Sequence, residues 1–286
     1  MSRNGFFKSF DGTRLFYSVE GKGPPLVFCY GLVCSKLHWS YQMDYLKKNH
    51  TVIWFDYRGH HNSQIPKDPS TLTINAIAQD VECLVDELKL PPATFLGHSM
   101  GVNVVLDLFR RAPKKVRALV LANGSARDPM ETLFGTNLMQ YALPLARRAH
   151  KLSPWLANAL WRQQANSKLA HAVISWSGFN PGLAKEEDIA TYIRLFSAMD
   201  LDVTLRLLSD YEHYDALSWL HRVDVPTLII AGENDKVIPK ESQELMHQVI
   251  AGSRFALIRN GSHCPQMDIP ELVNAVIERF LGEGRL

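Results

Sequence analysis

The sequence lacks an excess of charge of one sign, a long apolar run and a dense set of cysteines. Its 286 residues carry a formal net charge of only +2, which gives no reason to expect a polyanionic partner such as nucleic acid. No window reaches the ~18 consecutive apolar residues of a membrane-spanning helix. The first residues also contain no apolar stretch of signal-peptide length. We therefore expect neither a membrane span nor a nucleic-acid partner.

The four cysteines are too few and too scattered for a disulfide framework, and none forms the CxxC pairs of a metal site. We therefore expect the cysteines to be free thiols, which are typical of a reducing compartment. A cytoplasmic location is predicted. The cysteines are Cys29, Cys34, Cys83 and Cys264.

Short apolar runs that alternate with helical patterns are what the sequence does contain. Residues 24–30 are a short continuous apolar run, and residues 50–57 are the next run that we expect to be buried. A glycine soon follows each, as in strands that are buried on both faces. Residues 73–90 have the apolar spacing of a helix, and Pro91 follows. Such alternation predicts an α/β protein with a mostly parallel sheet covered by helices on both faces.

The alternation is interrupted in the middle of the chain. Two alternating runs around Asp11-Gly12 predict an antiparallel hairpin at the start, which brings the expected sheet to eight strands. After Ser125, about 80 mostly helical residues precede the next apolar run, and a connection that long needs structure of its own. We therefore predict a core of residues 1–125 and 208–286, with a helical cap of residues 126–207 inserted after the sixth strand.

A serine between two glycines stands where one of these strands meets a helix. The stretch Gly97-His98-Ser99-Met100-Gly101 follows an apolar run and opens a helical pattern. In this context a Gly-x-Ser-x-Gly pattern places the serine hydroxyl on a sharp, exposed turn, as a nucleophile requires. The alternative is a serine in an ordinary strand–helix turn; the context favours the nucleophile.

A serine nucleophile needs a base and a carboxylate that orients the base. Both groups should follow later strands, because ligands bind at the carboxyl edge of a parallel sheet. Glu233 and Asp235 follow one apolar run, and His263 follows the last one. The order Ser99, acid, His263 is the order expected for this architecture.

Four segments together resemble the α/β-hydrolase superfamily, which includes small esterases, monoacylglycerol-type lipases and C–C bond hydrolases. The resemblance covers about residues 5–124 and 208–286. The segments read GHSMG, DYRGHHNS, IIAGENDKVIP and GSHCPQMDIPELVNAVIERFL.

This resemblance implies roles for individual residues. Asp235 rather than Glu233 would orient His263. The oxyanion would be bound by the backbone N–H groups of Met100, which follows the nucleophile, and of Leu32 in the loop Tyr30-Gly31-Leu32. Tyr30 stands where similar proteins carry histidine.

The remaining polar residues of these segments suggest supporting roles. Asp56, Arg58 and His60 are expected to fix their loop through ion pairs and hydrogen bonds. A metal site there is disfavoured, because adjacent histidines on an extended loop point apart. His98 is interpreted as a supporting residue, and Cys264 as a packed thiol rather than a redox-sensitive one.

The sequence thus predicts a serine hydrolase that cleaves carboxylic esters of small to medium acyl chain through an acyl-enzyme, with no metal and no organic cofactor. The partner would be a small-molecule ester. Aromatic residues are the candidates for lining the substrate pocket. They are Trp39, Trp155, Trp176 and Phe179.

Other functions use the same residues and remain open. C–C bond hydrolysis, enol-lactone hydrolysis and cofactor-free perhydrolysis all fit the triad, whereas an aspartate-nucleophile dehalogenase or epoxide hydrolase is disfavoured because the nucleophile position holds serine. Basic residues of the cap allow docking of an acidic acyl carrier protein, although a solvated helix face explains them as well. A ligand receptor without turnover is the alternative outside the enzymes, since fold does not fix function.

Overall fold

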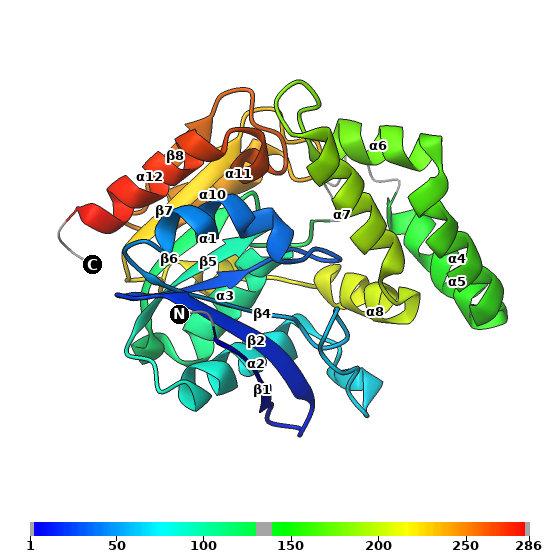
Figure 1. Ribbon diagram of the computed structural model, residues 1–286, viewed down its shortest axis with the longest axis horizontal. Coiled ribbons are helices and arrows are strands. Elements are labelled where there is room, and N and C mark those ends of the chain that lie inside the picture. Colours follow the sequence, from blue (N-terminus) through cyan, green and yellow to red (C-terminus); the bar gives the residue numbers. More distant parts are fainter. Residues whose placement is uncertain (1–2, 130–138, 284–286) are drawn as a thin grey trace.

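An eight-stranded sheet organises the computed structural model, which describes residues 3–129 and 139–283 (Figure 1). Its strand order is β1-β2-β4-β3-β5-β6-β7-β8. The first two pairings, β1–β2 and β2–β4, are antiparallel, and the other five are parallel. The strands are β1 Arg3–Lys8, β2 Arg14–Gly21, β3 Pro25–Cys29, β4 Thr51–Phe55, β5 Ala93–His98, β6 Val116–Ala122, β7 Thr227–Gly232 and β8 Arg254–Ile258.

Helices connect the parallel strands. Those of the core are α1 Ser40–Leu46, α2 Ile74–Glu87, α3 Met100–Arg111, α9 Leu217–Leu220, α10 Lys240–Val249, α11 Pro265–Asp268 and α12 Pro270–Gly282. Between β6 and α9 lie α4 Met139–Leu152, α5 Pro154–Gln163, α6 Lys168–Gly178, α7 Glu186–Ala198 and α8 Leu201–Tyr211. Short 3-10 turns lie at Lys36–Trp39, Pro69–Thr71, Pro113–Lys115 and Gln164–Asn166.

The central strands are buried along their whole length. Every residue of β3, β5 and β7 is buried, so helices cover the sheet on both faces. Helix α1 packs against α12, and α2 packs against α3. The prediction of a mostly parallel, doubly covered sheet with an N-terminal hairpin is confirmed.

The register of the parallel strands brings their carboxyl ends to one edge of the sheet. Cys29 of β3 pairs with Gly97 of β5, and His98 of β5 pairs with Ala122 of β6. Ala122 in turn pairs with Ile230 of β7. The residues that follow these strands therefore lie side by side, and they include Ser99.

Helices α4 to α8, here called the insertion, separate β6 from β7 in the chain. Helix α8 ends at Tyr211, beyond the predicted boundary at 207. Residues 130–138 of the predicted cap lie outside the described residues. In Figure 1, α4 and α5 lie at the end of the insertion that is farthest from the sheet. Within the described ranges, no helix is both long and apolar enough to cross a membrane.

Candidate active site

Ser99 occupies a strained turn between β5 and α3. Its φ of 54° and ψ of −124° are rarely adopted by a residue with a side chain, and its N–H donates to the Ala122 carbonyl at 3.0 Å. The flanking glycines allow the close approach of α3. A Cβ on Gly101 would lie 2.4 Å from the Cys29 carbonyl oxygen, and a Cβ on Gly97 would lie 2.5 Å from the Gly101 oxygen. The sequence therefore needs both glycines to hold the serine at the edge of the sheet.

Asp235 and His263 are hydrogen-bonded to each other. His263 Nδ1 lies 2.9 Å from Asp235 Oδ2 and 3.2 Å from Oδ1. An Nδ1–H that donates to a carboxylate leaves Nε2 unprotonated in the neutral ring, as a general base requires. Glu233, the other acid of this turn, is exposed and instead accepts from the Asn260 N–H at 3.0 Å.

The Asp235 carboxylate is held by three further donors. Its side chain is fully buried, and Oδ1 accepts the backbone N–H groups of Val237 and Ile238 at 2.8 and 2.9 Å. Oδ2 accepts from Asn123 Nδ2 at 2.7 Å. Burial of a carboxylate is tolerated when its oxygens are fully hydrogen-bonded.

Sequence reasoning missed Asn123. It follows β6 directly, has a φ of 49°, and also donates to the Ser262 carbonyl at 3.1 Å. Its position after a buried strand, at the same edge as Ser99, was the available signal. An Asn-Gly pair is also a common turn pattern, so the same two residues fit a turn as well as a functional site.

Ser99 and His263 line one apolar cavity of about 310 Å³. The sheet edge supplies one wall, and helices of the insertion supply the other. Apolar residues from the insertion dominate that second wall: Trp161, Val173, Ile174, Phe179, Tyr192, Phe196, Leu208 and Tyr211. The cavity thus offers an aliphatic group a place next to the serine.

Three of the four aromatic residues expected in the pocket do not line this cavity. Phe179 does. Trp39 is fully buried behind the site, with its ring NH donating to the Cys29 carbonyl at 3.2 Å. Trp155 and Trp176 are 79% and 57% exposed. Their expected place in the pocket is corrected, because their helices turn these rings to the outside.

The loop after β3 passes directly beside the serine. A Cβ on Gly31 would lie 2.9 Å from Ser99 Cβ, and Leu32, the next residue, lines the cavity. Val33 has a φ of 50°, which is costly for a β-branched residue. Met100 begins α3, and the first N–H groups of a helix lack intrahelical acceptors. Both backbone N–H groups expected for the oxyanion thus flank Ser99.

Tyr30 makes a reciprocal pair with Tyr57. Tyr30 Oη accepts the Tyr57 N–H at 2.9 Å, and Tyr57 Oη donates to the Tyr30 carbonyl at 2.8 Å. Their ring centroids are 4.2 Å apart. Burial raises the pKa of both phenols well above the usual value, so both remain neutral donors. The tyrosine therefore fixes the start of the loop where similar proteins carry histidine.

The segment DYRGHHNS supports this loop rather than contacting the cavity. His61 Nε2 lies 2.8 Å from the Cys34 carbonyl, while the Asp56 carboxylate accepts two bonds from Asn62 at 2.8 and 3.1 Å. Arg58 is fully buried and pairs with Asp80 of α2 at 2.6 and 2.8 Å. The expected ion pairs and hydrogen bonds are confirmed for this segment. Within the described residues, no group of three His, Cys, Asp or Glu side chains has the arrangement of a metal site.

A stack of histidines lies beside His263. His98 Nε2 lies 2.9 Å from the His263 carbonyl oxygen, so it donates to that oxygen, and His38 stacks on the His98 ring at 5.6 Å. Burial holds the pKa of His98 well below its usual value and lowers the pKa of His38 to about 3. Both rings are neutral, and His98 fixes the backbone of His263. Sequence reasoning gave His98 this supporting part but missed His38.

Cys264 follows His263 and is packed, as expected. It is buried in a small apolar cluster with Phe179 and Met267. Burial raises the pKa of its thiol well above the usual value, which disfavours the reactive thiolate.

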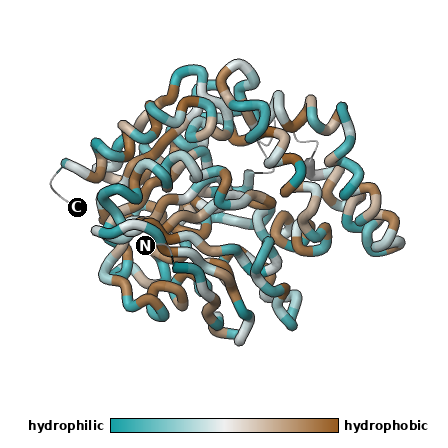
Figure 2. The backbone as a smooth tube through the Cα atoms, in the orientation of Figure 1, coloured by the Kyte–Doolittle hydropathy of each residue, from teal (hydrophilic) through white to brown (hydrophobic). Residues whose placement is uncertain are grey.

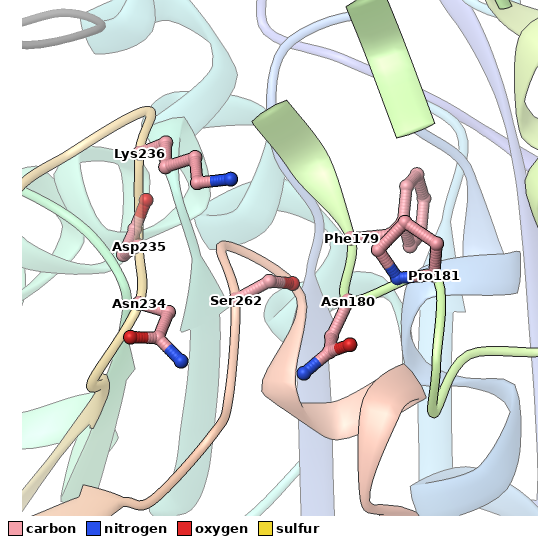
Figure 3. A pocket seen from close by; sticks show the side chains of 7 residues that line it. All are labelled: Phe179, Asn180, Pro181, Asn234, Asp235, Lys236 and Ser262. Atoms are coloured by element: carbon pink, nitrogen blue, oxygen red, sulfur yellow. The ribbon is translucent and has the colours of Figure 1, made fainter. Parts of the chain in front are cut away.

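A second, polar pocket of about 450 Å³ lies on the outer side of Asp235 (Figure 3). It separates the turn after β7 from the segment that follows α6. Hydrogen bonds across this junction tie the end of α6 to the core: Ser262 Oγ to the Gly178 carbonyl at 2.9 Å, and Lys236 Nζ to the Trp176 carbonyl at 3.2 Å. Phe179 lines both pockets, so this junction positions a wall of the apolar cavity.

Comparison with known proteins agrees with this geometry. Residues 24–270 match the model of the alpha/beta hydrolase fold family. The chain is 26% identical to 3-oxoadipate enol-lactonase 2 of Acinetobacter baylyi, over 93% of this chain and 92% of that protein. It is 24% identical to human Protein ABHD8 over 90% of its own length but spans only 54% of that protein. A crystal structure of a hydrolase from Pseudomonas aeruginosa superposes with a TM-score of 0.77, at 25% identity and 98% coverage of both chains.

Proposed function

Because the chain belongs to the alpha/beta hydrolase fold family, we propose that it is a serine hydrolase that cleaves carboxylic esters of small to medium acyl chain. Ser99 is the nucleophile, His263 the general base and Asp235 the residue that orients it. One observation carries the proposal: His263, joined to Asp235 at 2.9 Å, lines the same apolar cavity as a serine held on a strained turn.

Attack begins with proton transfer from Ser99 to His263. The base accepts the proton at Nε2, while Nδ1–H stays hydrogen-bonded to Asp235. The buried carboxylate stabilises the imidazolium and keeps the ring in the productive tautomer. Val237, Ile238 and Asn123 hold that carboxylate in place.

The tetrahedral intermediate carries its negative charge on the former carbonyl oxygen. The backbone N–H groups of Leu32 and Met100 donate to this oxygen, and the N-terminus of α3 adds a favourable dipole. His263 then protonates the leaving alcohol. Water attacks the acyl-enzyme by the same route and releases the acid.

The cavity favours an aliphatic acyl group. A volume of about 310 Å³ lies at the small end of ligand pockets, which range over roughly 300–1,000 Å³. The described residues that line it include no Asp, Glu, Lys or Arg. Burial raises the pKa of Tyr211 and lowers that of His38, so both are neutral there. A charged acyl chain would lose its hydration without gaining a partner.

A cyclic ester is a second candidate substrate. The similarity to an enol-lactonase over 93% of the chain favours it, and the same attack opens a lactone. The leaving alcohol then stays attached to the acyl group. Hydrolysis of aliphatic lactones in parallel with linear esters distinguishes the two substrates.

Steady-state hydrolysis of p-nitrophenyl esters from acetate to palmitate tests the proposal. Wild type should turn over, with an optimum at short to medium chains, and Ser99→Ala should lose on the order of 10³-fold or more in kcat. Asp235→Asn should be strongly impaired, whereas the matched change Glu233→Gln should leave kcat/KM unchanged. Full activity of Ser99→Ala, or loss of activity in Glu233→Gln but not in Asp235→Asn, overturns the assignment.

A further inference from the structure

The insertion exposes large apolar side chains on three successive helices. They account for nine residues, each 48–79% exposed, and we call them the outer apolar face. The outer apolar face comprises Tyr141, Leu145 and Leu152 of α4, Trp155, Leu156 and Leu160 of α5, and Leu169, Val173 and Trp176 of α6. Single exposed apolar residues need no explanation, but nine of them on three helices that follow one another in the chain indicate an interaction site.

Helical spacing shows that this set forms organised faces. Tyr141 and Leu145 are four residues apart on α4, and Leu169, Val173 and Trp176 follow at four and three on α6, so each group lies on one side of its helix. A different side of α4 supplies the buried contact, since Leu143 packs with Leu201 and Leu205 of α8. Figure 2 shows apolar segments on these outlying helices as well as along the sheet. The outer apolar face is therefore additional to what the fold buries.

The charged residues of the three helices that carry the outer apolar face are all basic. Residues 139–178 contain five Lys and Arg residues and no Asp or Glu. Arg147 is paired with Glu212 of α8 at 2.7 Å. The other four residues are exposed: Arg148, Lys151, Arg162 and Lys168.

We propose that the outer apolar face docks the protein on an anionic phospholipid surface. Leucine and tryptophan side chains enter the interface between headgroups and acyl chains, where the amphipathic indole ring is favoured. The four exposed cations lie at headgroup level and attract the anionic lipid. The helices lie on the surface and do not span it.

The charge selects this occupant over the alternatives. A second copy of the chain, docked face to face, would bring two uniformly basic surfaces together, with no acid in residues 139–178 to offset them. An acidic carrier protein would meet the cations, but charged contacts of that kind leave the nine apolar side chains without partners. Only a surface that is both anionic and apolar matches both properties.

The substrate cavity reaches the outer apolar face. Val173 is half exposed and also lines the cavity, and its neighbour Ile174 lines the cavity too. An apolar ester dissolved in the lipid would thus enter beside α6. This last step rests on the proposed function, whereas docking itself does not.

Flotation of the full chain with vesicles tests the docking. Wild type should float with vesicles of phosphatidylglycerol and phosphatidylcholine, and pure phosphatidylcholine should bind it at least roughly tenfold more weakly, because several cations lose their partners. High salt should weaken binding in the same direction. Ser99→Ala should float as wild type does, so failure of docking and failure of the proposed chemistry are separable.

Substitutions on the outer apolar face should reduce binding without loss of the fold. Leu152→Ser/Leu169→Ser removes two side chains that are 78% and 75% exposed, and its lipid affinity should fall by about tenfold or more. The matched control Leu257→Ser/Leu272→Ser, at sites 40% and 43% exposed on β8 and α12, should bind as wild type does. Hydrolysis of soluble p-nitrophenyl acetate should be unchanged in both.

Charge and fluorescence give independent readouts. Arg148→Glu/Lys151→Glu should abolish the preference for phosphatidylglycerol, whereas Lys22→Glu/Lys114→Glu, exposed positions of the core, should retain it. Tryptophan emission of wild type should shift to the blue on vesicle binding. Trp155→Phe should remove much of that shift, because Trp155 is 79% exposed in the free protein.

Three results would overturn the proposal. The first is no flotation of wild type with phosphatidylglycerol vesicles. The second is a dimer in sedimentation velocity that Leu152→Ser/Leu169→Ser dissociates, without vesicle binding, which assigns the face to a second copy. The third is binding of an acidic acyl carrier protein that depends on Arg148 and Lys151, again without vesicle binding.

Discussion

Asp235 shows how single residues prepare the site for its chemistry. Four donors surround its two oxygens: the N–H groups of Val237 and Ile238, Asn123 Nδ2 and His263 Nδ1. Donors on both oxygens hold this buried carboxylate in one orientation. The orientation of the His263 ring therefore depends on donors that take no part in the bond-making steps.

Removal of the Asn123 side chain should reduce turnover. Asn123→Gly keeps the positive φ that the backbone requires and deletes the amide that donates to Asp235 and to the Ser262 carbonyl. We expect kcat to fall roughly tenfold, with little change in KM, because the base is less well oriented in the transition state. Lys89→Gly is the control, because Lys89 is exposed and also has a positive φ, of 50°. This variant should keep kcat. An unchanged kcat in Asn123→Gly would show that the other donors suffice.

The sequence predicts those site residues whose role is indicated by their position after an apolar run. Ser99, Asp235 and His263 each follow an apolar run, and the structure places all three at one edge of the sheet. Asn123 also follows an apolar run, but its Asn-Gly pattern fits an ordinary turn equally well. His38 carries no such signal, because its contacts join segments that are far apart in sequence. The orientation of Trp155 and Trp176 depends on which side of a helix meets the core, and an insertion with apolar residues on several sides leaves that undetermined.

Among the elements, the buried pair Arg58–Asp80 connects the loop after β4 to helix α2. Arg58 also reaches Asp11 of the hairpin turn at 3.0 Å and the Thr71 carbonyl at 3.1 Å. Ser9 at the end of β1 donates to Asp80 as well. One guanidinium group thus joins three segments that are distant in sequence. Its hydrogen-bond partners replace the water that a buried cation lacks.

Loss of the Arg58 side chain should destabilise the folded protein. Arg58→Met leaves Asp80 buried without its cation, and the free energy of unfolding should fall by about 3–5 kcal/mol. Arg58→Met/Asp80→Leu should recover part of that loss, because neither buried charge remains. The exposed pair Lys115–Asp86 provides the comparison, since Lys115→Met should change the free energy by less than about 1 kcal/mol. Chemical denaturation measures all three, and equal effects at the two sites would contradict this role of burial.

Element positions in the core are predictable because apolar runs bounded by glycine have one physical interpretation. The runs at 24–30 and 50–57 contain β3 and β4, and the pattern over 73–90 contains α2. The insertion was predicted only as helical. Its helices carry apolar residues both toward the cavity and toward the outside, so periodicity alone gave no unique buried face.

Across the whole molecule, buried histidines couple stability to pH. His38, His60 and His98 are buried, and burial lowers the pKa of His38 and His60 to about 3 and holds that of His98 well below its usual value. The unfolded chain binds these protons near pH 6.5 while the folded protein does not. Their contribution to stability is therefore fully present above pH 6.5 and is lost as the pH falls toward 3.

Substitution of His60 tests this coupling between stability and pH. Between pH 6.5 and 5, each such histidine should lower the free energy of unfolding by roughly 2 kcal/mol. His60→Gln should therefore show a shallower decrease over this range than wild type, whatever its absolute stability. Buried carboxyl groups with a raised pKa, such as Asp56 and Asp268, act in the opposite direction in both proteins and cancel in the comparison. Parallel pH profiles would show that His60 is not neutral in the folded state.

The cavity sets the size of the acyl group through contacts between core and insertion. Ile174→Trp should fill part of the 310 Å³, which should shift the optimum to shorter chains while acetate hydrolysis stays near the wild-type rate. Ala190→Trp adds the same ring at an exposed position of α7 and should leave the optimum unchanged. A chain-length profile that Ile174→Trp does not alter would place the acyl group elsewhere.

Trapping of the acyl-enzyme tests the central claim most directly. The protein is mixed with excess p-nitrophenyl butyrate, quenched with acid during turnover and analysed by intact mass and peptide mapping. We expect one butyryl group, carried by the peptide that contains Ser99, and none in Ser99→Ala. A butyryl group on another residue, or steady turnover with no covalent intermediate in wild type, would contradict the proposed mechanism.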